Sequence, residues 1–486
     1  SDSWSEDAKT DCVNAILELG YYPNAVEFLL DIANTPEQVK LATQFQSDLQ
    51  LSMVSDPIRK NSFIRKLKLY NIVFQILLDV DKKALSSLEQ ASDATLIGNG
   101  SVSDMQKSNS PVFVDGNGQL ITYYSQIRDE CYKICLNYKD KMFHFEFYKW
   151  FAENGVSEKL LYIDTPYILE FLQDKSQKDL EMSKLLWMYY SKKGDYYEAA
   201  NQLYELALSR FDIKLVDWIQ FLSVANSFIQ GIETQFLKQD TTNLASRISD
   251  LISVSNLQDE LLLTILQDSR IGELAKNIAK QQLDGEILTI NDLYNEYIDP
   301  LGYYELALIS YKLSDYRNFE DILSKWESLF DKWYIEYKRK PNYETELFFT
   351  DLSHKFAIIA DRLKDVDNLF PIMSLLSLMF KSVYTHLGDK QKVEPGTVVN
   401  SFIKSGISYS KLYYNLRNLI ESTTYEQFEG FSGVLNSEMI FLLEGWYKND
   451  KRLREVISGE AIRKLRKYDI DNDPVDKYIK ATGNPL

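Results

Sequence analysis

The sequence predicts an all-α protein, an elongated and irregular α-solenoid of stacked helical hairpins. Apolar residues recur at helical spacing over most of the chain, and a turn of the form Gly-x-Tyr appears several times between such helices. Only 11 prolines and 19 glycines interrupt 486 residues, as long helices require. A single hairpin cannot bury its apolar faces alone, so neighbouring hairpins are expected to stack around a shared core.

The clearest hairpin lies between Lys184 and Ser209. Its first helix has apolar residues at relative positions 0, 3, 4 and 7, namely Met182, Leu185, Leu186 and Tyr189. We expect Gly194 to end this helix in the left-handed conformation and Asp195 to cap the next one. The second helix repeats the spacing with Ala200, Leu203, Tyr204 and Ala207. The small Ala199 and Ala200 predict that the two backbones come close at the turn.

The turn of this hairpin recurs along the chain. Gly20, Gly194 and Gly302 are each followed by Tyr two residues on and by Ala five residues on, and Ser314-Asp315-Tyr316 is a degenerate fourth copy. Gly-x-Tyr-x-x-Ala resembles the turn inside tetratricopeptide repeats, which recur every 34 residues. The spacing here is 174, 108 and 12 residues, so the sequence predicts an irregular solenoid.

Four regions follow from the order of these patterns. Residues 1–91 predict N-terminal helical hairpins, with helix starts at Asn34-Thr35-Pro36 and Ser55-Asp56-Pro57. Residues 92–119 are small and polar, which predicts an exposed loop, and Val112–Val114 with Leu120–Thr122 predict a small β-hairpin at its end. Residues 120–447 predict a continuous α-solenoid, and residues 448–486 predict a basic helical tail.

The charge of the chain limits its partners. The formal net charge is −17, so the body as a whole is not expected to bind nucleic acid or an anionic membrane. No run of 18 apolar residues predicts a membrane span, and three cysteines are typical of a reducing, intracellular compartment. Residues 448–468 are the exception: they hold eight basic and three acidic residues, a net charge of +5, which leaves −22 on the rest.

Patterns that carry catalysis or metal binding are not found. Cys131, Cys135 and His144 lack a fourth zinc ligand, so we interpret the cysteines as buried helix residues. Asp115-Gly116-Asn117-Gly118 departs from a calcium loop at its sixth and twelfth positions. His144, His354 and His386 lie far apart on apolar-rich helices, which favours packing or surface roles. The sequence therefore predicts no catalytic residue, no metal site, no cofactor and no enzyme.

The hairpin and its surroundings resemble a known family. The resemblance rests on Thr165–Leu172 (TPYILEFL), Leu185–Tyr190 (LLWMYY) and Trp218–Ala225 (WIQFLSVA), with Ala199, Ala200, Leu203 and Ala207 between the last two. Their order and spacing over residues 160–226 are similar to the C-terminal half of the large inner-ring scaffold nucleoporins of the one-fifty-five and one-seventy type. The rest of the chain is similar in its helical texture.

This resemblance implies a structural scaffold of the nuclear pore complex, in the nuclear envelope, that supports nucleocytoplasmic transport without chemistry of its own. It also implies partners, namely linker nucleoporins that dock short disordered motifs onto the solenoid, and no direct insertion into the membrane. A helical-repeat adaptor of another assembly, such as a vesicle coat or a proteasome lid, stays open as an alternative, because it would show the same hairpin physics.

A docking site is expected near the C-terminal end. The helix predicted from Ile372 to Tyr384 is apolar nearly all round and must be covered on every side, by neighbouring helices or by a partner's short apolar segment. Met373 and Met379 would suit such an adaptable surface. An acidic or phosphorylated flank of the same segment would be attracted by six basic residues, Arg452, Arg454, Arg463, Lys464, Arg466 and Lys467. Nucleic acid is the alternative ligand of this basic tail. The simplest interpretation of its charges is a solvated helix surface that binds no partner.

Overall fold

A computed structural model describes residues 6–50, 56–97, 112–114, 120–232, 239–339, 345–385, 393–422, 432–463, 465 and 468–483. These residues are almost entirely helical, with one two-stranded sheet among them, so the predicted all-α class is confirmed. The chain divides into two compact units. Unit 1 comprises Ser1–Leu206 with Phe228–Phe236, and unit 2 comprises Ala207–Ser227 with Leu237–Leu486.

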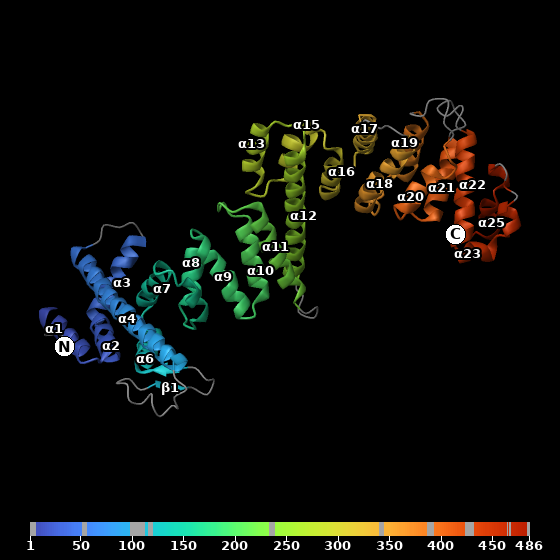
Figure 1. The fold of residues 1–486 in the computed structure, drawn as a ribbon. Coiled ribbons are helices and arrows are strands. Elements are labelled where there is room, and N and C mark those ends of the chain that lie inside the picture. Colours follow the sequence, from blue (N-terminus) through green and yellow to red (C-terminus); the bar gives the residue numbers. More distant parts are fainter. Residues whose placement is uncertain are drawn as a thin grey trace. The chain divides into compact units, whose positions relative to one another are not determined.

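Unit 1 is built around one long helix, α4. The elements of this unit, in chain order, are α1 (Glu6–Glu18), α2 (Tyr22–Ala33), α3 (Pro36–Gln50), α4 (Pro57–Ile97), β1 (Val112–Val114), β2 (Leu120–Thr122), α6 (Tyr123–Asn137), α7 (Lys141–Glu153), η1 (Ser157–Tyr162), α8 (Ile168–Ser176), α9 (Leu180–Lys192) and α10 (Tyr196–Ala207). Helices α2, α3, α6 and α7 all pack against α4, which is drawn in light blue in Figure 1. Aromatic rings fill the core between α4 and α7, where Phe74 stacks on Phe147 and Trp150.

The predicted helix starts and the predicted β-hairpin are confirmed. Helix α3 begins at Pro36 and α4 at Pro57, where the Asp56 carboxylate accepts a hydrogen bond from the backbone N–H of Ile58 at 3.0 Å. Strands β1 and β2 pair antiparallel, with Val112 opposite Thr122. The predicted loop begins too early, because α4 continues to Ile97, six residues into the range 92–119. Alanine and leucine in that stretch favour the helix. Residues 98–111 and 115–119 of the predicted loop lie outside the described residues.

The hairpin of α9 and α10 has the predicted buried faces. Met182, Leu185, Leu186 and Tyr189 of α9 are at most 7% exposed, and Ala199 and Ala200 of α10 are fully buried. The Asp195 carboxylate accepts a hydrogen bond from the backbone N–H of Glu198 at 3.2 Å, which confirms it as the cap. The predicted close approach is wrong, since the backbone of α9 lies closer to α8 than to α10. Bulky side chains set the distance between helix axes, and the buried tyrosines of this hairpin outweigh its alanines.

The recurring turn is a glycine-ended helix terminus, as predicted. Gly20, Gly194 and Gly302 have φ of 81°, 80° and 69°, and in each copy the next residue's N–H bonds to the carbonyl five residues before it. The fourth copy is offset by one residue. Asp315, with φ of 50°, takes the place of glycine there, and Tyr316 donates to the carbonyl of Tyr311 at 2.9 Å.

Unit 2 contains the remaining helices. In chain order they are α11 (Leu215–Gln230, which ends in unit 1), α12 (Gln239–Gln267), α13 (Glu273–Leu283), α14 (Ile290–Leu293), the π-helix η3 (Tyr294–Ile298), α15 (Asp299–Leu301), α16 (Tyr304–Leu313), α17 (Phe319–Lys338), α18 (Thr345–Leu363), α19 (Ile372–Thr385), α20 (Thr397–Lys404), α21 (Tyr409–Ser422), α22 (Ser432–Asn449), α23 (Lys451–Val456), α24 (Gly459–Arg463), η4 (Ile470–Asn472) and α25 (Pro474–Thr482).

Helices α16 to α22 of unit 2 stack in two rows. In one row α17 packs on α19 and α19 on α21, while in the other α16 packs on α18, α18 on α20 and α20 on α22 (Figure 1). Each helix therefore touches the second helix after it, which is the arrangement of a solenoid. One continuous apolar core runs from Leu308 to Val475 through both rows.

Candidate docking surface

The basic residues predicted to bind a partner lie on short helices that expose them. Arg452 and Arg454 of α23 and Arg463 of α24 are all exposed. Helix α23 turns Leu453 inward, where it is fully buried, so its arginines face solvent. Among the described residues, no ion pair involves any of these three guanidinium groups. Lys464, Arg466 and Lys467 lie outside the described residues.

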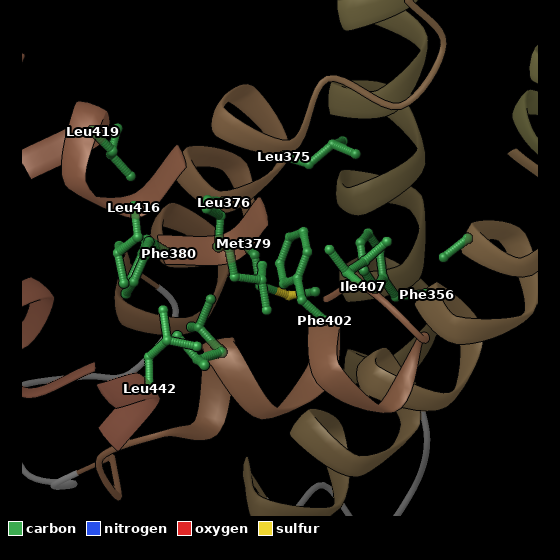
Figure 2. Packing of buried hydrophobic residues seen from close by; sticks show 14 of the residues in the cluster. Phe356, Leu375, Leu376, Met379, Phe380, Phe402, Ile407, Leu416, Leu419 and Leu442 are labelled. Carbon is green, nitrogen blue, oxygen red and sulfur yellow. The ribbon is translucent and has the colours of Figure 1, made fainter. Parts of the chain in front are cut away.

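The predicted apolar helix α19 is largely covered by its neighbours. Leu375, Leu376, Met379, Phe380 and Val383 are at most 1% exposed. Figure 2 shows Met379 among Leu376, Phe380 and Phe402, in the middle of the core. Met373, the second residue of the helix, is only partly buried. Of the two methionines, Met373 is therefore the one that solvent reaches.

The structure does not bring the methionines and the arginines together in one pocket. The main contacts run from α19 to α21, from α21 to α22, and from α22 to α23 and α24. An open groove of about 700 Å³ lies elsewhere, between α18 and α20, and mixes apolar and polar side chains. Phe349 and His354 line its α18 side, and Asn400 and Lys404 line its α20 side. Neither predicted group of site residues contributes to this groove.

A buried carboxylate holds the C-terminal segment to α21. Asp473 is fully buried and accepts hydrogen bonds from the hydroxyl groups of Tyr413 and Tyr468, both at 2.6 Å. Its other oxygen accepts from the backbone N–H of Val475 at 2.9 Å and so begins α25. The guanidinium of Arg417 lies 3.3 Å from the carboxylate oxygen that accepts from the two tyrosines. Asp-Pro before an amphipathic stretch is a sequence signal for such a cap, but the tyrosines come from 60 and 5 residues away.

A second buried carboxylate caps α20 from another helix. Glu438 of α22 is fully buried and accepts hydrogen bonds from the backbone N–H groups of residues 396, 398 and 399, at 3.0, 3.5 and 3.0 Å. Burial raises the pKa of Glu438 to about 7, although these hydrogen bonds oppose the rise. In the sequence, Glu438 stands out as a charged residue at a core position of its helix. Its neighbours Leu435, Met439 and Leu442 are all apolar.

His144, Cys131 and Cys135 of unit 1 are buried within the fold. His144 is 1% exposed and its ring nitrogens contact the carbonyl of Tyr138 at 2.7 Å and the hydroxyl of Tyr148 at 3.1 Å. Burial lowers the pKa of His144. Cys131 and Cys135 are buried thiols, as predicted, and burial raises the pKa of Cys131 to about 12. Within the described ranges, no group of three or more histidine, cysteine or acidic residues is placed to hold a metal ion.

No helix among the described residues combines the length and the apolar character that a membrane span needs.

Comparison with known proteins identifies similar sequences. The model of the family described as "Non-repetitive/WGA-negative nucleoporin C-terminal" matches residues 1–481. Nucleoporin NUP170 of Saccharomyces cerevisiae is 34% identical over 486 residues, which is 100% of this chain and 30% of that protein. A probable nucleoporin of Schizosaccharomyces pombe is 27% identical over 478 residues, which is 96% of this chain and 32% of that protein. The chain thus spans about a third of the length of these relatives.

Solved structures share the fold. The C-terminal domain of Nup170 from Chaetomium thermophilum, crystallised in complex with Nup145N, matches with a TM-score of 0.77 and 24% identity, over 95% of this chain and 85% of that one. A second structure of the Nup170 C-terminal domain from Chaetomium thermophilum matches with a TM-score of 0.74 and 22% identity, over 94% of this chain and 80% of that one. The likeness extends along both units, since it covers nearly the whole chain.

Proposed function

Because this chain belongs to the non-repetitive/WGA-negative nucleoporin family, we propose that it is the helical part of a structural scaffold of the nuclear pore complex. The observation that carries this proposal is the family match over residues 1–481, together with a fold shared over nearly the entire chain. A scaffold of this kind supports nucleocytoplasmic transport by holding other proteins in place at the nuclear envelope. It needs no catalysis, and the buried His144 and Asp473 are both engaged in hydrogen bonds within the fold.

The partner in this proposal is a short segment of another nucleoporin. The related Nup170 domain was crystallised with Nup145N, and a stacked-helix fold offers long surfaces to such segments. An acidic segment would be repelled by most of this chain, which carries −22, and attracted by residues 448–468, which carry +5. Arg452, Arg454 and Arg463 would meet its acidic flank, with Lys464, Arg466 and Lys467 adding charge. Met373 would contact an apolar part of it, while Met379 stays in the core beneath the surface.

Charge reversal tests the docking proposal. The variant Arg454→Glu with Arg463→Glu is expected to slow association with purified Nup145N roughly tenfold at low salt, because steering charges act mainly on the association rate. Its association should also depend less on salt than that of the wild type. Stopped-flow fluorescence at two salt concentrations measures both quantities, and the melting temperature should stay unchanged.

The matched control reverses two exposed basic residues outside the tail, Arg210→Glu with Lys214→Glu. This control carries the same change in net charge and should associate at nearly the wild-type rate. If both variants slow association equally, net charge explains the effect and the basic tail is not a docking surface. If neither changes it, these arginines do not contact the partner.

Nucleic acid is the second candidate ligand of the tail, since three exposed arginines have no ion pair among the described residues. Phosphate contacts would make the affinity for a DNA duplex fall steeply with salt. Weak binding with little salt dependence, unchanged by Arg454→Glu with Arg463→Glu, would remove this candidate.

A further inference from the structure

A pocket of about 330 Å³ in unit 2 combines aromatic rings and carboxylates away from the basic tail. It lies where the π-helix η3, α16 and α17 meet. Six of its lining residues carry rings or charges: Tyr294, Asp299, Tyr311, Tyr316, Asp321 and Lys325. None of them has a role in the proposed scaffold function.

Three tyrosine rings form one wall of this pocket. The rings of Tyr311 and Tyr316 stack with centroids 4.5 Å apart at 26°, and Tyr294 lies 5.5 Å from Tyr311. The hydroxyl oxygens of Tyr294 and Tyr311 are 2.7 Å apart, which fixes the two rings relative to each other. The π-helix places Tyr294, because its carbonyl accepts from the N–H of Asp299 five residues on. Such π turns often occur where a side chain must be aimed at a functional site.

The pocket already holds one cation from its own chain. The Nζ of Lys325 lies 2.5 Å from the carboxylate of Asp299 and 5.8 Å from the ring centroid of Tyr294. A carboxylate and an aromatic face together are a favourable setting for a positive charge, since the ring attracts a cation within about 6 Å. This half of the pocket is therefore balanced in charge.

The second carboxylate of the pocket, Asp321, lies four residues before Lys325 on α17 but is not paired with it, because Lys325 pairs with Asp299. The carboxylate of Asp321 accepts a hydrogen bond from the hydroxyl of Tyr316, whose ring is part of the tyrosine wall. Within the described part of the chain, no lysine, arginine or histidine forms an ion pair with Asp321. A neutral tyrosine stabilises the carboxylate but does not neutralise it, so one negative charge faces the pocket beside an aromatic surface.

We propose that this pocket binds the guanidinium group of an arginine from an extended segment of a partner protein, stacked on Tyr316 and paired with Asp321. A planar guanidinium suits this site better than an ammonium group, because it stacks on aromatic faces and is weakly hydrated. The acidic chain, with a net charge of −17, attracts basic segments from a distance. The site is distinct from the basic tail and selects partners of the opposite charge, and it does not depend on the scaffold role.

Saturation-transfer NMR on the purified chain tests the proposal, with butylguanidine as the probe and butylurea as its neutral isostere. The wild type should transfer saturation to butylguanidine and not to butylurea. The variant Asp321→Asn keeps the size of the side chain and an acceptor for Tyr316, and should weaken the probe's affinity roughly threefold to tenfold. The control Asp250→Asn removes one exposed carboxylate from α12, outside the pocket, and should leave the affinity unchanged.

A second variant separates the ring from the charge. Tyr316→Leu removes the aromatic face and should also weaken binding of butylguanidine, and circular dichroism will show whether each variant keeps its helices. Equal losses in Asp321→Asn and Asp250→Asn would overturn the proposal, because general acidity would then explain the binding. Equal transfer to butylurea, or no transfer to butylguanidine, would overturn it as well.

Discussion

Asp140 in unit 1, whose side chain is 11% exposed, and the fully buried Asp473 in unit 2 both begin a helix, but they are neutralised differently. The carboxylate of Asp140 accepts from the hydroxyl of Tyr70 at 2.7 Å and lies 2.5 Å from the Nζ of Lys66. The side chain of Lys66 is only 2% exposed. Burial alone would raise the pKa of Asp140, but the hydrogen bond and charge of Lys66, helped by Tyr70, lower it below its usual value.

Asp473 has no cation of its own. Two tyrosine hydroxyls bind it, and the nearby Arg417 is shared with Asp476 at 3.2 Å and with Glu421 at 3.0 Å. Burial, together with Asp473, raises the pKa of both Tyr413 and Tyr468 well above the usual range. When an isolated ion pair loses one partner, the remaining buried charge has no counter-charge, which is strongly destabilising. Arg417 has two other carboxylate partners, so its charge stays neutralised when Asp473 is lost. The two units should therefore respond differently to loss of a single partner.

The largest effect is expected from Lys66→Met. Removing the lysine leaves the largely covered Asp140 carboxylate without its cation, which should destabilise unit 1 by about 3–5 kcal/mol. Urea titration or calorimetry measures the loss. The control Lys60→Met changes an exposed lysine of the same helix and should stay within about 0.5 kcal/mol. A loss below about 1 kcal/mol for Lys66→Met would mean that water or Tyr70 already satisfies Asp140.

A smaller effect is expected from Asp473→Asn. The amide keeps one acceptor oxygen, which can serve either the two tyrosine hydroxyls or the first turn of α25, and Arg417 retains two other carboxylates. The free energy of unfolding of unit 2 should fall by about 1.5–3 kcal/mol, the range for hydrogen bonds to a charged group. Asp469→Asn, an exposed cap nearby, is the matched control. A loss as large as that of Lys66→Met would show that Arg417 is not effectively shared.

The smallest effect at neutral pH is expected from Glu438→Gln, because Glu438 has only backbone N–H partners and a pKa of about 7. Its pKa is raised in the folded state above the usual 4.5, so folding favours the protonated form. The contribution of Glu438 to stability is therefore fully present below pH 4.5 and is lost as the pH rises through 7.

The variant should lose this pH dependence while changing stability by less than about 1 kcal/mol at neutral pH. Between pH 5.5 and 7.5 the wild type should become less stable relative to Glu438→Gln, by up to about 1.4 kcal/mol per pH unit. Glu444→Gln, an exposed change in the same helix, should keep the wild-type profile. Parallel profiles for all three proteins would show that Glu438 stays ionised throughout, held by its three N–H donors.

Local features of this protein were predictable because they depend on neighbours in the chain. The left-handed Gly194, the cap at Asp195 and the buried face of α9 all follow from spacing within a few residues. The basic tail and the apolar helix α19 were also readable from the sequence. Their separation by intervening helices was not, because it depends on which helices stack on which.

The sequence by itself determined the helices, their ends and the stacked fold class, since helical periodicity and capping are interactions over three to five residues. Tertiary structure alone decided which charges are buried. Glu438 and Lys66 stand at core positions of their helices, and only the partners brought by α20 and by Asp140 make those positions tolerable. Tyr413 meets Asp473 from 60 residues away, and Tyr294 meets Tyr311 from 17 residues away, because folded helices place them together. The partners of a carboxylate are the groups that lie near it in the folded structure, and sequence separation does not predict which groups those are.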